Sequence, residues 1–134
     1  MPSPPARGTR LLLYEVGDPG DAAAVAAAVD LVVGRLCAEL GRFIGQGGVA
    51  ALAGRALSRA QRESPLLDGV RAQPEGRVSG LVEALGSAPA PEAVAAGTLL
   101  IDHLIGLLVS LMGEDVGLRP VRRLWPAVDL SNDP

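Results

Sequence analysis

The sequence predicts an all-α protein, a small helical bundle with three main helices and short additional helices. Hydrophobic residues make up 49% of the 134 residues, which is far more than a disordered chain contains. Aromatic residues make up only 2%, so the core must consist mainly of leucine, valine, isoleucine and alanine. Leucine and alanine favour helices. Apolar residues also recur at three- and four-residue steps over three long stretches, which is the period of an amphipathic α-helix.

The length of the chain fits one domain. We expect residues 1–10 to form a flexible arm, because this stretch is rich in proline and lacks the apolar run of a signal peptide. A single helical domain follows over 11–126, and 127–134 is expected to be a loose tail. The apolar run at 11–16 is too short for its period to separate a strand from a helical turn.

The first long helix is predicted from Pro19 to Arg42, with Asp18 as its cap and proline at its first position. The glycine-rich stretch 45–48 then breaks the helix. A second helix is predicted over 49–63, because small and apolar residues again share one side and a proline follows.

Between the second and third long helices the helical period is lost. Residues 66–80 contain a turn signal and could pair as a minor β-hairpin or remain a loop. A short helix is expected near 78–86, the third long helix over 91–112 and a last short helix over 119–125. Gly113 is expected to end the third helix, with a possible new cap at Asp115. The predicted core comprises Val29, Val32, Leu36, Leu40, Leu52, Leu57, Leu81, Leu85, Leu100, Leu104, Leu107, Leu108 and Leu111.

The third helix approaches the length of a membrane span, but it carries an aspartate and a histidine at its centre. No arginine lies close to either flank to orient a span, so we expect no membrane crossing. Small and polar residues recur along one side of this otherwise apolar helix at four-residue steps. This narrow line predicts a buried central helix or a helix–helix interface. This helix-interface set is Thr98, Asp102, Gly106 and Ser110.

His103 is the sole histidine, and its neighbour Asp102 points about 100° away on a helix. No serine-hydrolase or zinc motif accompanies it, so we predict no catalytic residue, no metal site and no cofactor. Histidine-phosphotransfer domains also carry an exposed histidine on a helical bundle. Their usual lysine is missing here and the glycine is one position early, so a signalling protein or enzyme using His103 remains an alternative.

All twelve basic residues are arginine, a bias typical of GC-rich genomes, so we expect a bacterial protein. Permanently charged guanidinium groups suit carboxylates or phosphates. Two clusters are candidate partner-binding residues: Arg55, Arg59 and Arg62 on one helix face, and Arg119, Arg122 and Arg123 near the C-terminus. A net charge of −3 and the scarcity of aromatic residues make nucleic acid an unlikely ligand, although weak binding through the first cluster is a third hypothesis.

Taken together, these patterns predict a non-enzymatic cytoplasmic protein that binds other protein chains as an adaptor or regulatory module. An arginine face would contact an acidic partner, and apolar helix faces would join two copies into a homodimer. Cys37 is the lone cysteine, so no intramolecular disulfide can form, which suits a reducing compartment. We expect Trp125 to clamp the last helix on the core, with its indole N–H bonded to a carbonyl.

Overall fold

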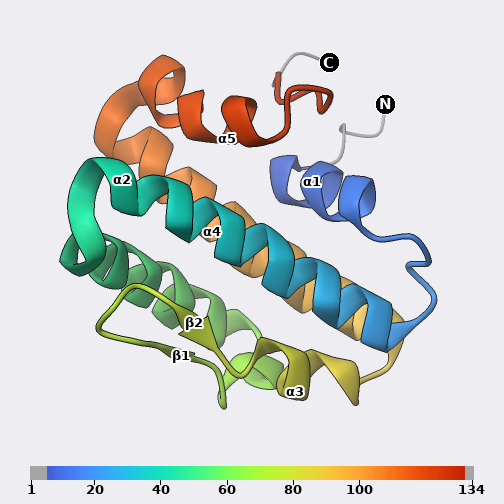
Figure 1. Ribbon diagram of the computed structural model, residues 1–134. Helices are drawn as coiled ribbons and strands as arrows, with labels where there is room; N and C mark the ends of the chain where they lie inside the picture. Colours follow the sequence, from blue (N-terminus) through green and yellow to red (C-terminus); the bar gives the residue numbers. More distant parts are fainter. Residues whose placement is uncertain (1–5, 132–134) are drawn as a thin grey trace.

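The computed structural model describes residues 6–131 and shows an all-α bundle with one minor hairpin (Figure 1). Two long helices, α2 and α4, lie side by side, and the shorter elements pack around them. The predicted arm and tail residues 1–5 and 132–134 lie outside the described part of the chain. The elements are α1 (Arg7–Glu15), α2 (Ala22–Glu63), a 3-10 turn η1 (Pro65–Leu67), β1 (Arg71–Ala72), β2 (Val78–Ser79), α3 (Leu81–Gly86), α4 (Ala90–Gly117) and α5 (Arg119–Leu124).

Helix α2 contains both the first and the second predicted helices, joined at a sharp turn. The turn is at Gly45, whose φ of 74° and ψ of 170° lie in a region that only glycine adopts without strain. Helical structure resumes at once, so the break is shorter than the predicted stretch 45–48. The second half of α2 therefore runs back beside α4 (Figure 1).

Helix α4 turns in the same way near its end. Gly113 has a φ of 81° and a ψ of 163°, and one further helical turn follows it. Gly113 interrupts the helix as predicted, whereas Asp115 lies inside this turn and is not a cap. Helix α5 begins two residues after α4, with Pro120 in its first turn, and folds back over the bundle (Figure 1).

The two long helices pack tightly against each other at Gly97 of α4. A Cβ atom at this position would overlap the Cγ2 atom of Val29 on α2, so no larger residue fits there without movement. Leucine, valine and isoleucine side chains from both helices fill the space on either side, and Leu104 and Leu36 are almost fully buried. The core therefore consists of aliphatic side chains, as the composition predicts.

Helix α1 confirms the helical alternative over residues 11–15, and it also includes residues 7–10, which we had assigned to the flexible arm. Arg7 donates to the carbonyl of Leu130 at 2.7 Å and pairs with Glu114, so this region is held by the end of the chain. Leu130 is itself buried, which differs from the loose tail expected there.

The start of α2 also differs from the prediction. The helix begins at Ala22, and Asp21 is the cap, accepting a hydrogen bond from the N–H of Ala23 at 3.0 Å. Asp18 instead accepts from the N–H of Gly20 at 2.9 Å and so stabilises the tight turn before the helix.

The predicted hairpin at 66–80 forms, with two strands of only two residues each. Arg71 pairs with Ser79 and Ala72 with Val78 in antiparallel register. Gly76 closes the turn by donating its N–H to the carbonyl of Gln73 at 2.9 Å. The short helix after it is α3, which starts at Leu81, three residues later than predicted.

Trp125 clamps α5 to the core, as expected, but with a different partner. Its side chain is 1% exposed, and its indole N–H donates to the carboxylate of Glu15 at 2.7 Å rather than to a carbonyl. The guanidinium of Arg35 lies over the ring at 5.2 Å from its centroid and pairs with the same carboxylate at 3.5 Å. Trp125, Glu15 and Arg35 thus connect the end of α5 with α1 and α2.

One predicted core residue is wrong. Leu111 is 65% exposed, whereas the other twelve predicted core residues are buried. Leu111 lies at an open hollow of about 240 Å³ between α4 and the second half of α2, so no side chain covers it.

Helix α4 is long and apolar enough to cross a membrane by length and composition alone. In its most apolar stretch, 44% of the residues are buried inside the protein. The core helix of a soluble protein passes the same test of length and composition.

Two glycines of α4 should respond in opposite ways to substitution by alanine. We expect Gly97→Ala to lower the free energy of unfolding by about 1–3 kcal/mol, because its Cβ atom meets Val29. Gly106→Ala should raise stability by about 0.5–1 kcal/mol, because no atom lies within 4 Å of the added Cβ and alanine favours the helix. Urea denaturation followed by circular dichroism measures both, and equal effects would contradict this packing.

Candidate functional site

Exposed apolar side chains gather at the end of the bundle where α2 and α4 turn. Phe43, Ile44, Leu111, Met112 and Val116 are all exposed. They surround two hollows of about 240 Å³ each, which share Ile44 and Met112 as a common wall. We call this continuous surface the apolar groove. Contiguous exposed apolar surface of this kind is typical of binding sites.

The two glycine turns create the groove. Gly45 ends the first half of α2 directly after Phe43 and Ile44, and Gly113 ends the main part of α4 directly after Met112. Both helices therefore end with apolar side chains that no further turn of the same helix covers. One hollow lies between Ile44, Leu111 and the second half of α2, and the other extends to α5 through Pro120.

Arginines from both predicted clusters line the groove. Arg55 lines one hollow, and Arg119 and Arg123 line the other. Among residues 6–131, Arg55 and Arg119 form no ion pair and no hydrogen bond through their side chains. The tertiary structure thus brings Arg55 and Arg119, which lie 64 positions apart in the sequence, to the same groove.

Arg123 is fixed rather than free. Its guanidinium donates to the Glu39 carboxylate at 3.2 Å and lies over the Phe43 ring at 5.5 Å from its centroid. Glu39 is a buried charged residue, 8% exposed, and Arg42 also approaches it at 3.8 Å. These contacts hold α5 against α2. Glu114, the acidic residue nearest to this cluster on the N-terminal side in the sequence apart from Asp115, pairs with Arg7 instead.

The remaining predicted arginines lie outside the groove. Arg59 and Arg62 are exposed on the second half of α2, and Arg122 is exposed on α5. None of the three forms an ion pair with another described residue.

The predicted helix-interface line divides into two halves. Thr98 and Asp102 face α1, where the N–H of Gly8 donates to the Asp102 carboxylate at 2.6 Å. A Cβ atom at Gly8 would overlap both this carboxylate and the carbonyl of Thr98, so α1 packs very closely here. Gly106 and Ser110 are exposed to solvent.

The contact with α1 changes the chemistry of this polar line. Burial raises the pKa of the Asp102 carboxyl above its usual value, and this effect outweighs the opposing effects of the Gly8 hydrogen bond and of the charges on His103, Arg10 and Arg7. The hydroxyl of Thr98 is buried without a hydrogen-bond partner among the described residues.

His103 has an acidic partner from another helix. Its Nε2 atom lies 2.7 Å from the Glu63 carboxylate at the end of α2, and both side chains are partly exposed. Sequence reasoning identified no such partner, because the pair lies 40 residues apart. An exposed histidine–carboxylate pair can transfer protons, but it is equally an ordinary surface ion pair. Ser64 and Glu92 line a shallow pocket beside this pair. Among the described residues, Ser64 forms no side-chain hydrogen bond to the histidine.

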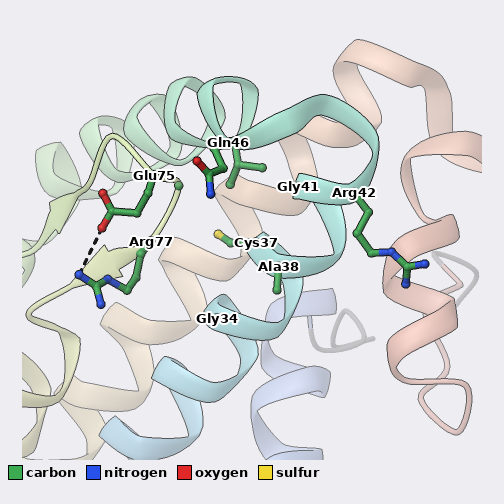
Figure 2. A pocket seen from close by; sticks show the side chains of 10 residues that line it. Gly34, Cys37, Ala38, Gly41, Arg42, Gln46, Glu75 and Arg77 are labelled. Atoms are coloured by element: carbon green, nitrogen blue, oxygen red, sulfur yellow. Dashed lines mark ion pairs between the residues drawn. The ribbon is translucent and has the colours of Figure 1, made fainter.

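Figure 2 shows a further pocket beside the first half of α2 and the hairpin. Its floor consists of Gly34, Ala38 and Gly41, and its rim carries the Glu75–Arg77 ion pair at 3.2 Å. The sulfur of Cys37 faces this pocket, yet the side chain is only 6% exposed. Burial raises the pKa of the Cys37 thiol to about 11, so the thiol stays protonated and unreactive at neutral pH.

The described residues contain no group of three or more histidine, cysteine, aspartate or glutamate side chains placed to hold a metal ion. The sequence analysis did not predict the apolar groove, because it assigned Leu111 to the buried core. Its one sequence signal is that an apolar pair directly precedes a glycine in both cases, Phe43–Ile44–Gly45 and Leu111–Met112–Gly113.

Comparisons with protein families, with curated proteins and with solved structures find no match to this chain.

Asp102 provides a pH-dependent test of the contact between α1 and α4. Because folding raises the pKa of Asp102, its ionised form lowers the stability of the folded state at neutral pH. Asp102→Asn keeps an oxygen acceptor for Gly8 without the charge. We expect this variant to raise the free energy of unfolding at pH 7, and the gain to disappear below about pH 4, where aspartate is protonated in both states.

The control for this variant is Asp102→Leu, which removes the acceptor and leaves the Gly8 N–H unpaired. It should lower the free energy of unfolding by about 1–3 kcal/mol. Urea denaturation, repeated at pH values from about 3 to about 8 in steps of roughly one unit, measures the free energy of unfolding of both variants. A destabilised Asp102→Asn at every pH would contradict the assigned effect of burial.

Proposed function

We propose that this protein is a non-enzymatic helical module that binds another protein chain through the apolar groove. The observation that carries the proposal is the concentration of five exposed apolar side chains around two adjacent hollows. Exposing such surface to water is unfavourable by roughly 25 cal/mol per Å², so covering it provides the driving force for association. An adaptor or regulatory role in a bacterial cytoplasm remains part of this proposal.

The arrangement of the groove supports a macromolecular ligand more than a small substrate. The groove is open, and its lining consists of aliphatic side chains, Phe43 and three arginines. It holds no histidine, cysteine, serine or carboxylate that could act as a nucleophile or a general base. Enzymatic use of His103 would have to occur elsewhere, at its pair with Glu63.

A site-specific photo-crosslinking experiment tests the proposal. A benzophenone amino acid at Leu111, which is exposed, is incorporated into the protein inside its native cells. We expect illumination to give a discrete adduct with a second protein, identified by mass spectrometry. The same amino acid at Val82 of α3, which is 48% exposed and outside the groove, should give no such adduct.

Charged substitutions in the groove complete the test. Ile44→Glu with Met112→Glu, in the chain that carries the crosslinker, should abolish the adduct because it introduces charges into the shared wall of the two hollows. Circular dichroism confirms that this variant is folded. The absence of an adduct at Leu111, or identical adducts from Leu111 and Val82, would refute binding at the groove.

Self-association is a second candidate, and the exposed half of the α4 line is the observation that favours it. No atom lies within 4 Å of a Cβ built at Gly106, so the open side of α4 allows another helix to come close. A second copy could pack its own α4 there.

Light scattering coupled to size-exclusion chromatography at micromolar concentration measures this assembly. We expect a dimer, and we expect Gly106→Gln to shift it to a monomer because the long side chain blocks close approach. Val82→Gln is the matched surface control and should leave the dimer intact. A monomeric wild-type protein would show that the chain does not self-associate.

A further inference from the structure

We infer that the apolar groove binds an amphipathic helix of another protein, whose apolar face is flanked by carboxylates. This inference rests on the proposed function and specifies the chemistry of the partner. Three features carry it: the hollowed shape of the groove, its apolar lining, and the arginines without partners at its rim.

The shape of the groove fits a helix. Two hollows of similar volume lie next to each other and share Ile44 and Met112 as a wall. A helix presents apolar side chains at three- and four-residue spacing along one face, and neighbouring side chains of this kind can enter adjacent hollows. The walls themselves are helical segments of α2, α4 and α5, between which a further helix can pack.

The charge of the groove specifies what flanks the apolar face of the partner. Arg55, Arg119 and Arg123 line it, and none of its lining residues is a carboxylate. Glu39 compensates Arg123, whereas Arg55 and Arg119 have no acidic partner in residues 6–131. Two uncompensated cations therefore stand at the two hollows of a protein whose net charge is −3. Planar guanidinium groups at these positions can bind carboxylates through paired hydrogen bonds.

The other occupants fit less well. A protein binds a lipid bilayer by inserting protruding apolar side chains into it, whereas this surface is hollowed between helices. A second copy that docked groove against groove would bring the same arginines together, and like charges oppose such an interface. A nucleic acid would need free aromatic rings for stacking, but Arg123 already covers Phe43.

Synthetic peptides of about 20 residues test the inference. One peptide carries a leucine face flanked by glutamates, a second carries the same face flanked by lysines, and a third is the first with its sequence scrambled. Fluorescence anisotropy at physiological salt measures binding to the full-length protein. We expect micromolar binding of the acidic peptide, about tenfold weaker binding of the basic peptide, and no binding of the scrambled peptide.

Protein variants assign the preference to named residues. Arg55→Glu with Arg119→Glu should reverse it, so that the lysine peptide binds more tightly than the glutamate peptide. Arg59→Glu with Arg62→Glu is the matched control: it makes the same change in charge at unpaired arginines outside the groove and should leave the preference unchanged. Leu111→Ser should weaken the binding of both peptides, because it removes apolar contact area.

Three results would overturn the inference: equal binding of the acidic and basic peptides, an equal response to the two double charge reversals, or binding to phosphatidylcholine vesicles with about one third phosphatidylglycerol in the absence of peptide binding. If Leu111 crosslinks to a protein while the two peptides bind equally, the groove binds protein but does not select acidic helices. If Leu111 gives no adduct and no peptide binds, both the proposed function and this inference fail.

Discussion

The architecture of this protein depends on two glycines that hold a backbone conformation closed to other residues. Gly45 and Gly113 have nearly the same φ and ψ values, and each interrupts its helix at a single residue so that the chain changes direction. A side chain there would cost roughly 1–3 kcal/mol in backbone strain. The second half of α2 lies beside α4 because of the first turn, and α5 folds back because of the second. The groove between the two turns exists only when both reversals are present.

Charged residues in half-buried positions keep the groove in shape. Glu15 accepts from Trp125 and pairs with Arg35, while Glu39 pairs with Arg123 and Arg42. Each carboxylate connects α2 with the C-terminal part of the chain, and removing Glu15 would leave the buried indole N–H of Trp125 unpaired. The last helix, which carries one wall of the groove, is therefore fixed by two polar contacts as well as by the burial of tryptophan.

Much of the fold follows from local pattern. Three long apolar stretches, the glycines after them and the turn signal at residues 73–76 predicted the long helices, their breaks and the minor hairpin, all of which form. The predictions that differ have physical reasons. Leu111 satisfies the helical period but lies at an open hollow between α4 and the second half of α2, where it stays exposed. Residues 7–10 were predicted to be a flexible arm, yet they belong to helix α1. The N–H of Gly8 donates to the carboxylate of Asp102, 94 positions away in the sequence, and this contact fixes the start of the helix.

The candidate site shows the same division more sharply. Sequence alone determined that the protein would be helical and aliphatic, that its positive charge would come from arginine, and that Arg55 and Arg119 would lie in surface clusters. These properties depend on composition and on periods of a few residues. Only the tertiary structure decided which arginines lie beside exposed apolar side chains, and that His103 meets Glu63 while Asp102 meets Gly8. Those pairings depend on the directions in which two glycine turns send their helices, and no local pattern records such a direction.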